Sequence, residues 1–576
     1  MLAIRGKWAA VAAVGLLLGV FGALSLGAAL QKSPTADESF HLVAGYSYLR
    51  WGDFRINPEH PPLIKVLAAL PLLTLQTDDS ALSRQRRDRV QVNGKYGWLL
   101  ANQWLFSAND AETMFLYAKL PMIALAVALG LLVFCWAREL YGLAGAIAAL
   151  TLYVLDPNIL AHSSIIHTDV PFALAFFGGT YFFWRLLKEM TWFNWFGTVA
   201  FFSLSAITKF SFVTILPIWG LLALSVIFSS RPLRLPSVLL IAERARKAGW
   251  VAAIFLSLAA AAFLAIWGAY GFRYESFGGE RGPLVIRSAV EPSAWFKYVI
   301  AVNAERHFLP EAWLAGLVYS ISTFNRTAYL LGELSGGGFW LYFPIAFAVK
   351  TPLPTLVLLL LSLVMCLWRP RLCADERFLF VPLVSFFGLA MGSGMNIGLR
   401  HIIVVYPFLF VWLGGSAVRL WESRPMALRG GIVVMAIWLL GSTLSAFPHY
   451  LAYFNEAVDC RKAYEILVDS NLDWGQDLKG LKKWMDANGV KKIHLAYFGT
   501  ADPAYYGINA IYAPGTWTTV MSKTNNGNDA QADPYIAISA THLVGVYFGS
   551  ANPYARFLDQ TPVAAIGRSI FVYRTD

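Results

Sequence analysis

The sequence is poor in charged residues, since Asp, Glu, Lys and Arg together make up 14% of its 576 residues. Soluble domains usually contain about 25%. Only four cysteines are present, which excludes a disulfide scaffold, and an aromatic content of 15% excludes a disordered chain. Hydrophobic residues reach 57% instead. The composition therefore predicts a protein that crosses a membrane several times.

Acidic residues are fewer than basic ones, at 35 against 46, which gives a formal net charge of +11. Such an excess is also found in nucleic-acid-binding proteins. Here, however, much of it lies in short segments between apolar runs, as the positive-inside rule predicts for membrane proteins. We therefore expect contact with membrane lipids and no nucleic-acid partner. The largest group lies between two apolar runs and contains Arg231, Arg234, Arg244, Arg246 and Lys247.

Apolar runs long enough for a membrane-spanning helix recur along the first 450 residues. A span needs about 20 mostly apolar residues. By this measure we expect about 11 transmembrane helices, with the N-terminus on the cytoplasmic side and the C-terminus outside. The expected helices cover 8–30, 116–136, 143–156, 170–187, 196–209, 211–229, 249–271, 352–368, 378–392, 402–421 and 430–447.

Three long segments are then placed on the outer side of the cytoplasmic membrane: residues 31–115, residues 272–351 and the tail 448–576. The tail alternates helical and strand patterns, with an expected helix at 477–487 and strands at 492–498 and 535–539. The sequence thus predicts an all-α polytopic membrane domain, 1–447, followed by an extracytoplasmic α/β domain, 448–576.

Acidic residues follow the first expected span directly. Asp37 and His41 are four residues apart and would share one face of a helix, next to Glu38. A carboxylate held at a helix end can act as a general base or bind a metal. The alternative is an ordinary helix cap, because acids are favoured in the first turn.

A second group of polar residues lies in the segment 59–65 (EHPPLIK). Two prolines are well tolerated at a helix start, so Glu59 and His60 would lie at the positive end of the helix, with Lys65 one turn further. This arrangement could hold a phosphate or a metal. A capped amphipathic helix without a ligand is an equally good interpretation.

Further candidates lie at the outer ends of later helices. Asp169 begins one helix, where an N-cap is the default interpretation, and the preceding His162 and His167 match no metal-binding spacing. Cations on the outer side run against the positive-inside bias, so they suit the phosphate of a lipid substrate, although a single one could simply extend to the membrane surface. These cations are Lys209, Lys350 and Arg400, the last followed by His401.

These motifs resemble the GT-C superfamily of integral membrane glycosyltransferases. The resemblance rests on Asp37-Glu38, on residues 59–65, and on residues 167–171 (HTDVP). Residues 339–352 (FWLYFPIAFAVKTP) and 396–401 (NIGLRH) are similar to later helices of that superfamily. The most similar groups by motif are the family 39 protein O-mannosyltransferases and the lipid A aminoarabinose transferases.

The resemblance implies transfer of a sugar from a polyprenyl-phosphate donor to a protein, lipid or glycan acceptor, on the outer face of the cytoplasmic membrane. It implies Asp37 as the base of an inverting reaction, with Glu38 and Asp169 as further acidic catalytic residues. Glu59 matches a position that binds metal in some aminoarabinose transferases, so a divalent metal ion is a candidate cofactor. The expected donor-phosphate ligands are His60, Lys65, Lys209, Lys350, Arg400 and His401.

His60 departs from the lysine of the aminoarabinose transferases and agrees with the mannosyltransferases, which argues against an aminoarabinose donor. A second functional class stays open, namely a transporter or flippase of an isoprenoid-linked anionic lipid. The position of the polar residues at the outer interface and the lack of a visible inverted repeat favour the enzyme.

Overall fold

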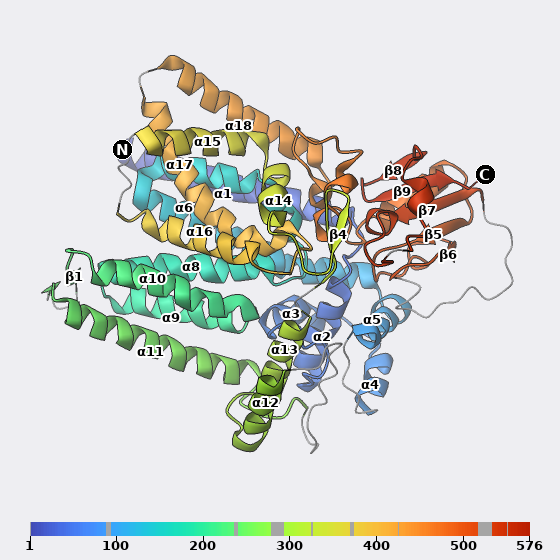
Figure 1. Cartoon of the computed structure of the whole chain (residues 1–576), viewed down its shortest axis with the longest axis horizontal. Helices are drawn as coiled ribbons and strands as arrows, with labels where there is room; N and C mark the ends of the chain where they lie inside the picture. The colour runs from blue at the N-terminus through green and yellow to red at the C-terminus, as the bar shows by residue number, and fades with distance from the viewer. Residues whose placement is uncertain are drawn as a thin grey trace.

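The computed structural model describes residues 2–87, 94–234, 240–277, 293–323, 326–368, 374–423, 425–516, 533–549 and 551–575. Long apolar helices lie roughly side by side in one body, and the tail forms a small sheet at one end of them (Figure 1). The opposite end carries the short strands β1 (Leu233–Arg234) and β2 (Leu240–Ile241). The structure thus has the predicted class, a polytopic helical protein with a C-terminal α/β region.

The helices of the membrane region follow the apolar runs. Seven described helices are long and apolar enough to cross a membrane, or eight if the bent pair α14 and α15 is one span. The membrane helices are α1 (Leu2–Leu30), α6 (Ala111–Val154), α8 (Asp169–Lys188), α9 (Trp192–Ala206), α10 (Ile215–Ile227), α11 (Arg244–Ala269), α14 (Tyr342–Lys350), α15 (Leu353–Trp368), α16 (Arg377–Met391), α17 (Tyr406–Glu422) and α18 (Met426–Ala446).

The difference from the expected number of about 11 has two causes. One cause is only apparent, because the 44-residue α6 contains both expected spans, 116–136 and 143–156, as two helices that meet at Gly142. The second helix folds back on the first, since the hydroxyl of Tyr153 donates to the carbonyl of Ala126 at 2.6 Å. Gly142 has φ 73°, a left-handed conformation that glycine adopts without a steric penalty. In addition, α9 and α16 have 15 residues each, too few to cross a bilayer as straight helices.

Shorter elements connect these helices. Asp156 accepts hydrogen bonds from the backbone of Asn158 and Ile159 and so caps α7, which has proline at its first position. The short elements are α2 (Glu38–Trp51), α3 (Leu63–Ala69), α4 (Ser80–Arg87), α5 (Gly94–Asn102), α7 (Pro157–Ser163), the 3-10 helices η3 (Phe210–Thr214) and η4 (Leu399–Val405), α12 (Ala294–Arg306), α13 (Glu311–Ser322), β3 (Ala328–Leu330) and β4 (Glu333–Ser335).

The tail contains a five-stranded sheet of order β6-β5-β7-β9-β8. Strand β5 pairs in parallel with β6 and β7, whereas β9 pairs antiparallel with β7 and β8. The predicted helix and the two predicted strands are present as α19, β5 and β7. The elements are α19 (Leu478–Ala487), β5 (Ile493–Ala496), β6 (Ala510–Tyr512), β7 (Tyr535–Ser539), α21 (Ala540–Leu543), β8 (Ala564–Ile566) and β9 (Ile570–Arg574).

The tail packs directly onto the segment that follows α1. The backbone amide of Ser33 donates to the carbonyl of Gln476, and that of Ala36 donates to the carbonyl of Trp474, both at 2.9 Å. Extended backbone of the two regions is thereby held together immediately before Asp37. The fold consequently places the first acidic motif at the junction between the membrane helices and the tail.

Candidate functional site

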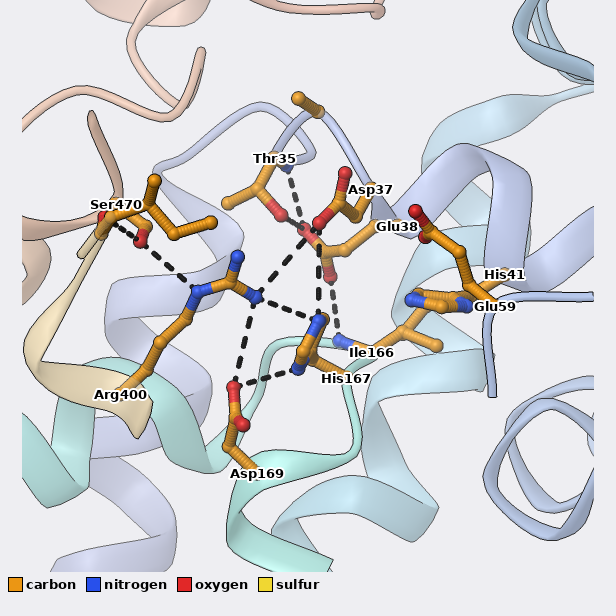
Figure 2. A network of polar contacts seen from close by, with 12 residues as sticks. Thr35, Asp37, Glu38, His41, Glu59, Ile166, His167, Asp169, Arg400 and Ser470 are labelled. Carbon is orange, nitrogen blue, oxygen red and sulfur yellow. Dashed lines mark hydrogen bonds and ion pairs between the residues drawn. The ribbon is translucent and has the colours of Figure 1, made fainter. Parts of the chain in front are cut away.

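Four segments that are distant in the sequence meet at this junction. The turn before α2 supplies Asp37, the loop before α8 supplies His167 and Asp169, the end of α9 leads to Lys209, and η4 supplies Arg400. We call these five residues the Arg400 cluster. Figure 2 shows the Arg400 guanidinium linked to Asp37, His167 and Asp169.

Asp37 is the carboxylate of the cluster that stays accessible, with 26% of its side chain exposed. Its Oδ2 lies 3.9 Å from Nη1 of Arg400 and 3.9 Å from Nε2 of His167. Asp37 occupies the N-cap position of α2, but its side chain makes no capping hydrogen bond there. A carboxylate held beside positive charge without a short hydrogen bond to it can accept a proton from a bound molecule.

Glu38 lies next to Asp37 but is completely buried and fully engaged. Its Oε2 accepts hydrogen bonds from the amide and the hydroxyl of Thr35, at 2.7 and 3.1 Å. Its Oε1 accepts from Nζ of Lys119 at 2.7 Å and from the amide of Ile166 at 3.1 Å. Glu38 therefore ties three segments together behind the cluster rather than facing its open side.

Asp169 and His167 contact Arg400 and hold its guanidinium in place. Asp169 is buried, and its Oδ1 accepts from Nζ of Lys209 at 2.5 Å, while its Oδ2 lies 2.7 Å from Nδ1 of His167. Nε2 of His167 is 2.7 Å from Nη1 of Arg400. Arginine can only donate, so His167 accepts at Nε2 and carries its proton on Nδ1, facing Asp169. The order of these contacts fixes the histidine tautomer.

The tail completes the environment of Arg400. Nε of Arg400 donates to Oγ of Ser470 at 3.0 Å, and the guanidinium lies 4.1 Å from the ring centre of Trp474. Arg400 is itself 5% exposed. A buried guanidinium with fixed donors and a cation–π contact is pre-organised to stabilise negative charge.

A group of imidazoles borders the cluster. The ring of His167 lies 5.3 Å from that of His41 and 5.6 Å from that of His60. Nδ2 of Asn57 donates to Nδ1 of His41 at 3.1 Å, so the proton of neutral His41 is on Nε2. Burial, followed by the neighbouring positive groups, lowers the pKa of His41 and of His60 well below the usual histidine value. Both rings are therefore neutral at neutral pH.

Glu59, the predicted metal ligand, pairs with Arg326, whose Nη2 lies 3.3 Å from Oε1. In the described part of the chain, no three His, Cys, Asp or Glu side chains are placed to hold a metal ion. A carboxylate already neutralised by a guanidinium does not by itself make a divalent-metal site. The residues present around Glu59 thus do not fit a bound metal.

Two predicted phosphate ligands donate to backbone carbonyls instead. Nζ of Lys65 donates to the carbonyls of Asn57 and His60, at 2.5 and 2.8 Å, and burial lowers its pKa to about 7. Nζ of Lys350 donates to the carbonyls of Leu451 and Asn471, at 2.9 and 2.5 Å. Both ammonium groups hold loop backbone in place, and these contacts favour structural roles for them.

The remaining two predicted phosphate ligands lie beside the cluster. His401 follows Arg400 in η4, and its Nε2 is buried without a hydrogen-bond partner among the described residues. His60 likewise has a buried Nδ1 that makes no hydrogen bond with any described residue. Neither imidazole is held by a strong polar contact through these atoms.

Sequence reasoning missed the contributions of Arg326, Ser470, Trp474 and Tyr547. Tyr547 donates to Oδ2 of Asp469 at 2.7 Å and stacks on the Phe498 ring with centroids 5.5 Å apart. These residues lie in the tail or beside it, and they carry no local motif. The one available signal was the density of polar residues at 469–477 (DSNLDWGQD), which falls in the contact region.

No protein-family model matches the sequence, and no curated protein matches it either. Among solved structures, the chain is similar to apo ArnT from Cupriavidus metallidurans, with 12% identity, a TM-score of 0.48, and coverage of 100% of this chain and 98% of that chain. For the same protein bound to undecaprenyl phosphate the TM-score is 0.44, with 11% identity and 98% coverage of both chains.

A second similar structure is the oligosaccharyltransferase AglB from Archaeoglobus fulgidus in complex with an inhibitory peptide and a dolichol-phosphate. It has 10% identity and a TM-score of 0.41, with coverage of 94% of this chain and 71% of that chain.

Proposed function

We propose that the protein transfers a sugar from a polyprenyl-phosphate donor to a hydroxyl group of a protein, lipid or glycan acceptor. One observation carries this proposal: a partly exposed carboxylate, Asp37, lies 3.9 Å from a buried guanidinium, Arg400. The carboxylate suits the acceptor, which must lose a proton. The guanidinium suits the donor, whose phosphate gains negative charge as the sugar leaves.

In the proposed reaction the acceptor oxygen bonds to the anomeric carbon of the sugar while its proton passes to Asp37. The bond from the anomeric carbon to the phosphate oxygen breaks, and its electron pair stays on the phosphate. The phosphodiester monoanion thereby becomes a monoester dianion, and Arg400 with Lys209 offsets the added charge. Attack opposite to the leaving group inverts the anomeric configuration.

The other members of the cluster act on Arg400 and Lys209. Asp169 contacts both cations, and its partner His167 accepts a hydrogen bond from Arg400. Asp169 keeps the guanidinium and the ammonium at one place without neutralising either of them fully. We therefore assign it a positioning role. Glu38 holds the turn that carries Asp37, through Thr35 and Lys119.

We further propose that the cluster and the tail face outward from the cytoplasmic membrane. α8 has 20 residues and so extends for about 30 Å, the thickness of a bilayer core. Asp169 is at its first residue, and the basic residues Arg185 and Lys188 are in its last turn. The positive-inside rule puts that last turn on the cytoplasmic side and Asp169 on the outer side.

The test is turnover of a defined donor. Purified full-length protein in lipid nanodiscs would be supplied with polyprenyl-phosphate-linked mannose or aminoarabinose, and free polyprenyl phosphate would be measured by mass spectrometry. We expect release that depends on the protein and rises with an added acceptor. A transporter would leave every donor intact, so the absence of release from a panel of sugars would contradict the proposal.

A further inference from the structure

A cavity of about 430 Å³ lies at the other end of α8 from the Arg400 cluster. Its walls come from the end of α8, the end of α10, the turn into β1 and the start of α16. Figure 1 shows these ends gathered near β1, away from the tail. The cavity is thus about 30 Å, one α8 length, from the site described above.

Four cationic side chains line the cavity, and only two acids accompany them. The cations are Lys188, Arg231, Arg234 and Arg377, and the acids are Glu189 and Asp375. Asp375 takes up part of the charge, since its carboxylate lies 3.1 Å from Nζ of Lys188 and 3.9 Å from Nη1 of Arg231. The cavity retains a positive excess.

Two of the arginines keep unused donors. Nη1 of Arg377 donates to the carbonyl of Ser225 at 3.2 Å, but its Nε is buried without a partner among the described residues. Arg234 is exposed, and its side chain makes no hydrogen bond or ion pair in the described part of the chain. A buried guanidinium N–H without an acceptor is costly, so a ligand with acceptor oxygens would stabilise this place.

The floor of the same cavity is apolar. Trp184, Leu187, Val226 and Phe378 line it, and each of these side chains is buried. Nζ of Lys188 lies 4.4 Å from the ring centre of Trp184. Cations above an apolar floor at the end of membrane helices match a ligand with a phosphate group and an adjoining apolar part.

We propose that this cavity binds the phosphate of an anionic membrane lipid, through Arg234 and Arg377, on the face opposite the Arg400 cluster. Arginine suits a phosphate because its planar fork can donate two hydrogen bonds to two oxygens. Ordinary topology-determining charge explains basic residues on this side but not a recess that contains an unpaired guanidinium N–H.

The experiment is a titration of the full-length protein in detergent with phosphatidylglycerol, followed by native mass spectrometry. Phosphatidylcholine of the same acyl composition is the reference lipid, and inorganic phosphate is the competitor. We expect preferential binding of phosphatidylglycerol. Displacement by inorganic phosphate at low concentration would identify a free phosphate as the ligand, whereas persistence of the lipid would identify the headgroup.

Variants separate this cavity from general surface charge. Arg234→Gln with Arg377→Gln should weaken phosphatidylglycerol binding by about fivefold for each cation removed. Arg234→Gln alone, which breaks no contact, keeps the test valid if the double variant does not fold. Arg244→Gln with Arg246→Gln is the matched control on exposed α11, and binding should stay within about twofold. Equal losses in both pairs, or no preference for phosphatidylglycerol, would overturn the proposal.

Discussion

Replacement of Asp37 by Asn tests the proposed base with little disturbance of the fold. The side chain caps no helix, and its nearest charged partners are 3.9 Å away, so an amide of the same size removes no short hydrogen bond. Proton transfer by a positioned side chain contributes about 10²- to 10⁴-fold to a rate. We therefore expect kcat to fall by that factor, equivalent to about 3–5 kcal/mol in the activation free energy.

The assay is the release of polyprenyl phosphate from the sugar donor, with the melting temperature measured in parallel. Asp110→Asn is the matched control, because Asp110 caps α6 on the same side of the protein and asparagine caps equally well. That variant should retain kcat within about twofold, whereas Asp37→Asn should bind the donor normally and turn it over slowly. Full turnover by folded Asp37→Asn would refute the assignment of the base.

Three further predictions concern stability and assembly of the site. Glu38→Gln leaves the buried Lys119 without its charge partner, so the free energy of unfolding should fall by about 3–5 kcal/mol in denaturant titrations. An unchanged free energy would contradict the structural role of Glu38. Gly398→Ala places a Cβ in steric conflict with Oγ of Ser470, so we expect the free energy of unfolding to fall by about 1–3 kcal/mol and turnover to decrease. Neither change would occur if the tail did not pack here. Burial lowers the pKa of His41, so the unfolded chain binds more protons than the folded chain below about pH 6.5. The melting temperature should therefore fall with decreasing pH in that range, and it should fall less steeply in His41→Gln. A steeper fall in the variant would be inconsistent with a neutral buried ring.

The elements of the fold were largely predictable because their patterns are local. The expected span 170–187 corresponds to α8, the expected strand 535–539 to β7 and the expected helix 477–487 to α19. Hydrophobic length and period act over neighbouring residues, so the sequence carries them directly. The number of spans was less predictable, since it depends on how far the 15-residue helices α9 and α16 extend.

The candidate site was predictable only in part. Asp37, Asp169 and Arg400, each predicted at a helix end, come together in space. Lys65 and Lys350 were predicted as phosphate ligands by the same reasoning, yet each ammonium donates to backbone carbonyls instead. A lysine near a helix end looks the same in the sequence whether its amine faces a ligand or a loop. The three-dimensional course of the loop decides between these roles, and no local pattern records it.

The tail also changes how the division at residue 447 is understood. Lys350, the last residue of α14, donates to the carbonyls of Leu451 and Asn471. Arg400 contacts Ser470 and Trp474. A buried ammonium or guanidinium without acceptors costs several kcal/mol. The first part of the tail thus supplies partners for charges that the membrane helices bury. Composition separates a membrane domain from an α/β domain at this boundary, whereas the polar contacts of the site join them into one unit.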